Sequence, residues 1–449
     1  MADHDEVGAR PPLAGTRVLE VAQNIAVPYC GWLLAGLGAE VVKVEPAEGD
    51  TMRFTTSLPV PEGDTPEGRI YSVVNRNKRS IVVDLAHPEA SEAIRPLVGW
   101  ADVVLVALKP SDVDRYGLDP DSIHRYDPST IVLDHRPFGS EGPYGGQGGY
   151  DILMQGMSGM AVTTGRTVPG GHYPATVRPP FNDFGTGMLS AFGVVAALRQ
   201  RDVDGRGQTV TTSLLATALN FMSPLISRFE AEPSMRDLWA AADPGPGADF
   251  EERRRAYEAV RVDTAALGLY FRHFQTADGF VSIGCLSPAL RRRFHTTTGV
   301  PTPAEAGVSP HDDGWRDLIA QAEAVFRNHS TDTWLDRLRA AGCPAARLNL
   351  PHEALDDPQV EANGFRSDLD HPRFGRHRVP AYPLRLSGSA PPPDRPAPIL
   401  DHDTVEVMLE AGLTEAQVGA LRVSGLVGRP VERSGSADGL DRATSRTAN

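Results

Sequence analysis

The stretch FNDFGTGMLSAFGVVAALRQRDVDGRGQTVTTS, residues 181–213, carries the signals that decide the fold. A carboxylate, Asp183, stands before the run Gly185-Thr186-Gly187, which predicts a flexible turn. An apolar segment at 188–198 predicts a helix, and a polar turn then leads into a β-type run at 209–214. A helix that returns through a short turn to a strand is the repeating unit of an α/β layer.

Asp183 has two interpretations at this position. Aspartate often caps the N-terminus of a helix, and the spacing alone favours that role. The alternative is an exposed, preorganised carboxylate beside unpaired backbone N–H groups, which together with the helix dipole can stabilise an oxyanion. The remainder of the chain has to decide between the two.

The N-terminal half alternates between strand and helix signals. Strands are predicted at residues 16–22, 39–45, 80–85, 101–108 and 130–134, with helices at 28–36 and 88–98. Short apolar strands separated by helices predict a parallel sheet covered on both faces, which is an α/β, doubly wound, Rossmann-like fold. The first strand is followed by AQNIAVP, without the GxGxxG of a dinucleotide site. A ligand is still expected beyond the carboxyl ends of the strands.

Shifts in composition predict the domain organisation. The predicted parts are a disordered N-terminus (1–12), a large Rossmann-like domain (13–225), a linker with a surface helix (226–262), a small α/β domain (263–344), a C-terminal segment (345–433) and a disordered tail (434–449). The linker is rich in proline, glycine and alanine, and the tail in serine, glycine and aspartate, as is typical of segments that cannot bury a core.

Composition also excludes several classes of function. A net charge of −14 over 449 residues argues against nucleic-acid binding. The three cysteines are far apart in sequence and the histidines lack ligand spacing, so neither a disulfide framework nor a metal site is predicted. We find no signal peptide and no apolar run of transmembrane length, which predicts a cytoplasmic protein without a membrane partner.

Basic residues recur near the predicted strand ends. Lys78 and Arg79 lie in NRNKRS, Arg115 lies in DRYG, and Arg53 follows the turn AEGD. Each alone is best interpreted as a solvated surface charge. Together they would suit a phosphate-rich anion, since arginine recognises phosphate through paired hydrogen bonds.

Several segments, taken together, resemble one known family. They are PLAGTRVLEVAQNIAVPYCGWLLAGLGAEVVKVEPAEGD (12–50), NRNKRSIVVDL (75–85), ADVVLVALKPSDVDRYGL (101–118), FGSEGPYGGQGGYDILMQGMSGM (138–160) and DGRGQTVTTSLL (204–215). With them the chain resembles, nearly end to end, the class III CoA-transferase (CaiB/BaiF) family. That family includes formyl-CoA and carnitine CoA-transferases and α-methylacyl-CoA racemases.

The resemblance implies a fold and a ligand. Family members have a Rossmann-like large domain, a small domain and a C-terminal segment that returns to the large domain, and two ring-shaped subunits interlock as a homodimer. CoA or acyl-CoA is implied as substrate, with no permanently bound cofactor. Lys78 and Arg115 match residues that contact the CoA nucleotide, and Arg79 and Arg53 are neighbouring candidates.

The resemblance also assigns the chemistry. Asp183 matches the catalytic aspartate, and Asp151 matches a carboxylate near the acyl site. The implied activity is transfer of CoA from an acyl-CoA to a carboxylic acid through an aspartyl anhydride and an aspartyl-CoA thioester. Ile25 stands where formyl-CoA transferase has a glutamine, which argues against formyl and oxalyl substrates.

Two alternatives remain open at this point. A racemase removes and returns an α-proton with two bases, but Tyr150 stands where the racemases have a histidine, and tyrosine is a poor base at neutral pH. A catalytically silent CoA-binding protein is the other alternative, because a fold does not guarantee its chemistry. The retained Asp183 argues against it.

Overall fold

The structure is a computed structural model that describes residues 10–55, 66–163, 167, 174–230, 240–260, 267–308 and 314–429. The chain divides into two compact units, one made of Met1–Ser227 with Ser367–Asn449 and the other of Arg228–Arg366. The predicted disorder of residues 1–12 and 434–449 lies outside the described residues, apart from residues 10–12.

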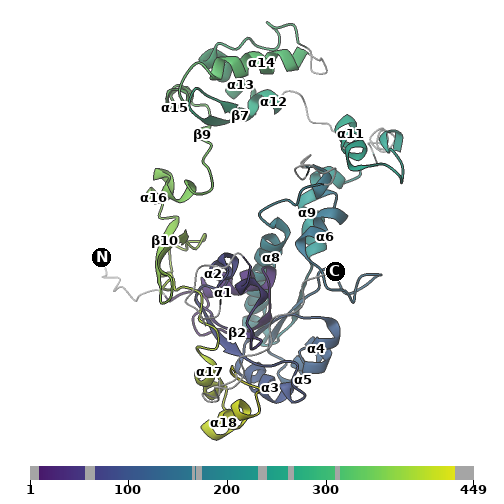
Figure 1. Cartoon of the computed structure of the whole chain (residues 1–449), viewed down its shortest axis with the longest axis vertical. Coiled ribbons are helices and arrows are strands. Elements are labelled where there is room, and N and C mark those ends of the chain that lie inside the picture. Colours follow the sequence, from purple (N-terminus) through teal and green to yellow (C-terminus); the bar gives the residue numbers. More distant parts are fainter. Residues whose placement is uncertain are drawn as a thin grey trace, which may run out of the picture. The chain divides into compact units, whose positions relative to one another are not determined.

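A six-stranded parallel sheet forms the centre of the first unit (Figure 1). Its strands are β1 (Arg17–Ala22), β2 (Glu40–Glu45), β3 (Lys78–Val82), β4 (Val103–Ala107), β5 (Ile131–His135) and β6 (Thr209–Thr212). Their order across the sheet is β3-β2-β1-β4-β5-β6, with every pair parallel. The predicted α/β, Rossmann-like architecture is therefore confirmed, and the strand order reverses between β1 and β4.

Helices cover both faces of this sheet. On one face lie α1 (Ala26–Ala35) and α8 (Phe181–Asp204), and on the other α3 (Ala90–Trp100), α4 (Pro110–Tyr116) and α5 (Pro120–Tyr126). Alternate residues of each strand supply the two cores: Val18 packs toward α1 and α8, whereas Leu19 packs toward α3. The short elements η1 (Thr51–Arg53), α2 (Arg69–Val74), α6 (Asp151–Met157), α7 (Met160–Thr163) and α9 (Leu214–Ile226) complete the N-terminal part of this unit.

Helix α8 begins at Phe181, so residues 185–187 are helical and the predicted flexible turn is wrong. Close packing explains why glycine occupies two of these positions. A β-carbon at Gly185 would lie 2.4 Å from the ring of Phe221 on α9, and one at Gly187 would lie 2.5 Å from the carbonyl oxygen of Ala26. Both contacts are far inside van der Waals distance, so the glycines allow α8 to approach α9 and α1.

The expectation that no apolar segment reaches membrane-spanning length also needs correction. The 24 residues of α8 are long and apolar enough to span a membrane by length and composition, with a mean hydropathy of 1.2 in the best window. Half of that window is buried, and Ala191, Val194 and Leu198 pack in the core beneath the sheet. A core helix satisfies the same criterion, so this helix is only weak support for a membrane span.

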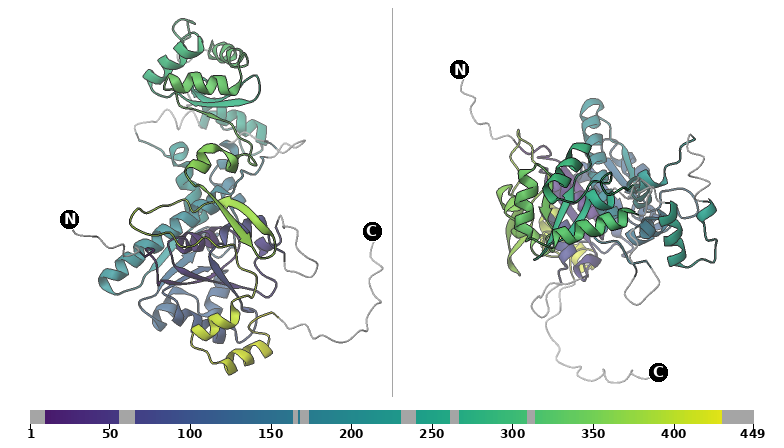
Figure 2. Two further views of the ribbon diagram at one scale, coloured as in Figure 1. Left: turned by 90° about the vertical axis from the view of Figure 1, so that its left-hand side faces the viewer. Right: turned by 90° about the horizontal axis from the view of Figure 1, so that it is seen from above.

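The C-terminal part of the chain belongs to the first unit. It contains the hairpin strands β10 (Arg366–His371) and β11 (Gly375–Pro380) and the helices α17 (Thr404–Glu410) and α18 (Glu415–Val423). Val407, Met408 and Val418 enter the same core as α3 (Figure 2, yellow helices). The backbone N–H of Gly428 donates to the carbonyl of Val82 at 3.0 Å, which ties the end of this segment to β3.

The second unit has its own core. An antiparallel sheet of β7 (Phe271–Gln275), β8 (Phe280–Gly284) and β9 (Ala345–Arg347) packs with α12 (Leu267–Tyr270), α13 (Pro288–Thr298), α14 (Gly314–Phe326) and α15 (Thr331–Ala340). The remaining elements are α11 (Phe250–Val260), η2 (Ala354–Asp356) and α16 (Pro358–Ala362). Phe274 stacks on Phe326 with ring centres 4.2 Å apart, at the middle of this core.

Candidate active site

A cavity of about 580 Å³ opens at the carboxyl edge of the parallel sheet. The segments after β1, β4, β5 and β6 contribute Ile25, Leu108, Pro137 and Leu214 to its wall. This is the edge at which open α/β sheets bind ligands, and the volume is in the usual range for small-molecule sites.

Both carboxylates predicted to be catalytic line this cavity. Asp183 is the third residue of α8, and Asp151 is the first residue of α6. Asp151 Oδ1 accepts the backbone N–H of Asn182 at 2.9 Å, so Asp151 pairs one of the open N–H groups at the start of α8. The N-cap of α8 is Pro180, so the interpretation of Asp183 as the cap is wrong.

The carboxyl of Asp183 is partly buried and lies near a like charge. Burial, and secondarily the negative charge of Asp151, raise the pKa of Asp183 to about 7. Both forms of Asp183 are therefore populated at neutral pH. A helix N-terminus favours the ionised form of a nearby carboxyl, but burial and the charge of Asp151 outweigh that effect here.

Gln155, which the sequence did not single out, connects Asp151 to the segment before α8. Its Nε2 donates to Asp151 Oδ2 and, at 3.0 Å, to the carbonyl of Val177, while its Oε1 accepts the N–H of Val177 at 2.9 Å. The side chain is 1% exposed. Gln155 therefore fixes the wall of the cavity formed by residues 176–180 relative to Asp151. The signal available in the sequence was its i+4 spacing from Asp151 on one helix face.

His135, the last residue of β5, also lines the cavity. Its Nδ1 lies 3.2 Å from the hydroxyl of Thr212, which lies 3.0 Å from that of Ser190 on α8. Burial lowers the pKa of His135 to about 4, so the ring is neutral at pH 7. Tyr150 lines the same cavity with 64% of its surface exposed.

Lys78 lies within a buried ion pair. Its ammonium group is 2.7 Å from Glu20 Oε2, 2.7 Å from the carbonyl of Pro28 and 2.8 Å from Asn75 Oδ1. These acceptors use all three donors of a lysine. Burial lowers the pKa of Lys78 to about 8, against the opposing effect of Glu20. The predicted contact of Lys78 with CoA is not favoured by this arrangement.

Arg53 and Arg79 also have partners inside the chain. Arg53 is 1% exposed and holds Glu45 through two hydrogen bonds of 2.7 Å. Arg79 lies 2.6 Å from both Glu40 and Glu410, which anchors α17 to the sheet. Neither lines the cavity at the carboxyl edge.

Arg115 differs from these three basic residues because its side chain is exposed, near the end of α4. Its Nη2 donates to the carbonyl of Ala86 at 3.1 Å. Arg115 does not line the cavity either, but it remains accessible to a phosphate.

Three other cations line the cavity: Lys109, Arg136 and Arg178. Arg136 is paired with Asp134 at 2.7 Å. Lys109 and Arg178 are exposed, and within the described part of the chain neither side chain has a hydrogen bond or an ion pair. No group of three metal-ligating side chains occurs among the residues that the structure describes.

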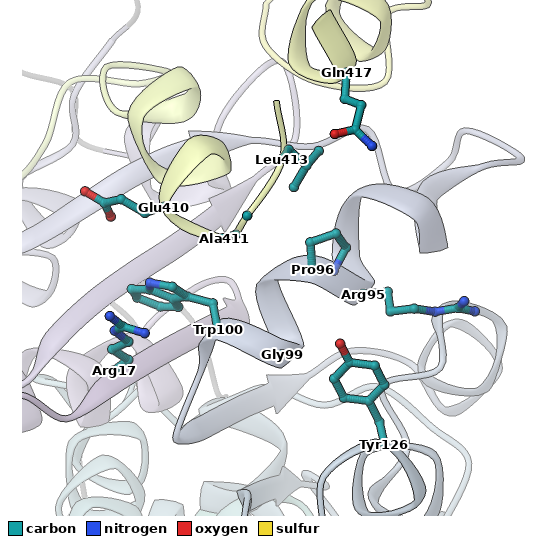
Figure 3. A pocket seen from close by; sticks show the side chains of 11 residues that line it. Arg17, Arg95, Pro96, Gly99, Trp100, Tyr126, Glu410, Ala411, Leu413 and Gln417 are labelled. Carbon is teal, nitrogen blue, oxygen red and sulfur yellow. The ribbon is translucent and has the colours of Figure 1, made fainter. Parts of the chain in front are cut away.

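A second cavity, of about 460 Å³, lies between α3 and the turn joining α17 to α18 (Figure 3). Arg17 faces the ring of Trp100, with its guanidinium carbon 5.5 Å from the ring centre. Glu410 and Gln417 come from the C-terminal helices. None of the six residues predicted for catalysis or CoA binding lines this cavity.

Comparisons with known proteins agree on one family. A sequence model of CoA-transferase family III matches residues 13–404. The chain is 31% identical to succinate–glutarate CoA-transferase of Agrobacterium fabrum, over 90% of this chain and 97% of that protein. It is 28% identical to the β subunit of succinyl-CoA–L-malate CoA-transferase of Chloroflexus aurantiacus, over 92% and 97%.

A solved structure has the same fold. The crystal structure of a CaiB/BaiF family protein from Brucella suis matches with a TM-score of 0.68 and 27% identity. The match covers 90% of this chain and 100% of that chain.

Proposed function

This chain belongs to CoA-transferase family III, and from that premise we propose that it transfers CoA through covalent intermediates on Asp183. It is an enzyme that takes CoA from an acyl-CoA and gives it to a carboxylic acid. The comparisons therefore argue against the alternative of a catalytically silent CoA-binding protein. The observation that carries the proposed mechanism is the position of Asp183, a partly buried carboxylate in a ligand-sized cavity.

The first half of the reaction consumes the acyl-CoA. The Asp183 carboxylate attacks the thioester carbonyl, the C–S bond breaks, and CoA thiolate leaves a mixed anhydride. The thiolate then attacks the aspartyl carbonyl of that anhydride. This step breaks the anhydride C–O bond, forms an aspartyl-CoA thioester and releases the donor acid as a carboxylate.

The second half runs the same steps in reverse. The acceptor carboxylate attacks the aspartyl thioester, which regenerates an anhydride and the thiolate. The thiolate attacks the acceptor's acyl carbon, which forms the new acyl-CoA and restores the Asp183 carboxylate. Every bond that forms in these steps is matched by one that breaks, and no net proton is transferred. The reaction therefore requires an ionised Asp183 and room for a carboxylate beside it.

The surroundings of Asp183 support both requirements. A pKa of about 7 leaves a large ionised fraction at neutral pH while keeping the carboxylate more nucleophilic than a solvated one. The hydrogen bonds of Asp151 and Gln155 hold the cavity wall in place, which limits reorganisation during the reaction.

The test is to trap the intermediate. Incubation with succinyl-CoA, quenching with hydroxylamine and peptide mapping should place the label on Asp183. Asp183→Asn should remove transfer but leave CoA binding intact, because the amide is nearly isosteric yet cannot form the anhydride. Arg199→Ala, an exposed change on the same helix, is the matched control. Label on Asp151, or substantial transfer in Asp183→Asn, would contradict the mechanism.

The racemase alternative has one observation in its favour, because His135 lines the same cavity and could act as a second base. Its pKa of about 4 makes it a weak base, which favours transfer. Exchange of the α-proton of a 2-methylacyl-CoA in D₂O measures this activity directly. Fast exchange that is lost in His135→Ala or Tyr150→Phe would move the assignment to racemase.

We also propose that the chain acts as a homodimer. Large apolar side chains are exposed along α8 and α9: Met188, Leu189, Phe192, Phe221 and Leu225. Phe192 alone is 75% exposed. Large exposed apolar side chains on two helices that contact each other favour a protein partner. Light scattering that showed an active monomer at micromolar concentration would refute the dimer.

A further inference from the structure

Arg178 lies in the segment of the cavity wall that precedes α8. Arg178 lines the cavity and is exposed, five residues before Asp183. The neighbouring Val177 is held on both its N–H and its carbonyl by Gln155. The backbone beside Arg178 is therefore held relative to Asp151, while the residue is exposed and lines the cavity.

The charge of Arg178 has no partner in the described part of the chain. In contrast, Arg136 in the same cavity is paired with Asp134. Among the described residues, no ion pair joins Arg178 to Asp183 or to Asp151. The pKa of Asp183 is raised by burial and by Asp151, without a cation that lowers it. The charge of Arg178 is therefore not neutralised by either carboxylate.

We propose that Arg178 binds the second, non-reacting carboxylate of a dicarboxylic acid whose first carboxylate exchanges CoA at Asp183. This inference rests on the proposed function. An arginine forms two parallel hydrogen bonds to a carboxylate and keeps its charge at any working pH. A chain of five residues spans at most about 17 Å, so one small diacid together with the two side chains can bridge Arg178 and Asp183.

The phosphates of CoA are the other anions that an arginine could bind. The pantetheine arm holds them far from the thioester sulfur, which has to lie beside Asp183 in the proposed reaction. Arg178 is tied through Val177 and Gln155 to Asp151, so it belongs to the acyl end of the cavity. A cation that serves the acyl end is expected to select among acids, not to set the affinity for CoA.

The experiment compares acids that differ only by one carboxylate. Succinyl-CoA serves as donor, and the acceptors are glutarate and its monocarboxylate counterpart valerate. The wild type should prefer glutarate, and Arg178→Ala should reduce kcat/KM for glutarate by about 10- to 100-fold, as for the loss of a hydrogen bond to a charged group. With butyryl-CoA as donor, transfer to valerate should change by less than about threefold, and Arg178→Lys should be intermediate because it keeps the charge but not the paired geometry.

Two further variants test whether the effect depends on the position of Arg178 or only on the loss of a positive charge. Arg199→Ala removes an exposed arginine of α8 outside the cavity and should keep the wild-type preference. Lys109→Ala removes another cavity cation, which follows β4 and caps α4. If Lys109→Ala lowers the glutarate-to-valerate ratio as much as Arg178→Ala does, general electrostatics explains the effect and the specific role of Arg178 is wrong.

The outcomes distinguish this inference from the proposed function. Transfer to both acids without a preference, or a weaker affinity for free CoA in Arg178→Ala, overturns the role of Arg178 and leaves the transferase intact. Absence of transfer to any acid overturns the proposed function. Calorimetric titration of glutarate into CoA-loaded wild type and Arg178→Ala then tests the role of Arg178 separately from the reaction. Equal affinities for glutarate overturn that role, and a 10-fold or greater loss of affinity in the variant supports it.

Discussion

The activity should depend on pH through Asp183, and Asp151 should set part of that dependence. A rise in pKa from 3.8 to about 7 means that the folded protein disfavours the ionised carboxyl by about 4 kcal/mol. Because the nucleophile is the ionised form, kcat/KM for the acyl-CoA should rise with pH around a midpoint near 7. At pH 6 it should fall to about one tenth of its plateau.

Asp151→Asn removes the like charge but keeps an oxygen that can accept the N–H of Asn182. Burial is the larger of the two causes and remains in the variant. The larger part of the rise should therefore persist, so the midpoint should fall below 7 but stay well above the ordinary value of 3.8. The midpoint is the readout, because the changed contact with Gln155 can lower the plateau rate by itself.

The assay is the initial rate of CoA transfer from succinyl-CoA between pH 5 and 9, with the same donor and acceptor for every variant, so that titration of the substrate carboxylates near pH 5 is common to all of them. Asp204→Asn makes the same change of charge at the far end of α8 and should leave the midpoint in place. A wild-type midpoint below pH 5, or a midpoint that stays or rises in Asp151→Asn, would refute the coupling between the two carboxylates.

Three further predictions concern stability, assembly and CoA binding. Because the folded-state pKa of Asp183 lies above its unfolded value, this group costs stability as pH rises from about 4 to 7. In urea unfolding, the stability of Asp183→Asn relative to wild type should therefore increase by about 3 kcal/mol between pH 5 and pH 8. A difference in unfolding free energy between the two proteins that does not change with pH contradicts the raised pKa. Phe192→Glu places a charge among exposed apolar side chains, so it should raise the dimer dissociation constant at least about 10-fold in sedimentation velocity without loss of helix content. An unchanged dimer would show that this face is not the interface. Lys78→Ala should cost about 1–3 kcal/mol of stability because it leaves Glu20 Oε2 buried without its partner, while Lys43 still pairs with Glu20 Oε1. Arg115→Ala should leave stability within about 0.5 kcal/mol and weaken CoA binding with a flatter salt dependence. Equal CoA affinity in wild type and Arg115→Ala would remove that assignment.

Local patterns in the sequence were sufficient for the architecture. Apolar runs such as VVLV in β4 and IVL in β5 are buried on both faces of the sheet, and only a sheet covered by helices on both sides accommodates them. The resemblance to a family placed Asp183 and Asp151 as a pair, and both line the cavity. These are properties of short segments, so they can be read without knowledge of distant contacts.

The partners of the charged side chains depended on the tertiary structure. Lys78 meets Glu20 across 58 residues, and Arg79 meets Glu410 across 331, so no local pattern distinguishes these pairs from a phosphate site. Lys78 and Arg79 begin β3, at the amino end of the strand, whereas the cavity lies at the carboxyl edge of the sheet. The same holds for Gln155, whose partner Val177 lies 22 residues away, and for His135, whose burial lowers its pKa. The sequence by itself determined which segments become strands and helices, because backbone preference and burial are local. The fold alone decided which charges are neutralised within the chain and which, like that of Arg178, remain open to a ligand, because Coulomb energy depends on distance in space and not on distance along the chain.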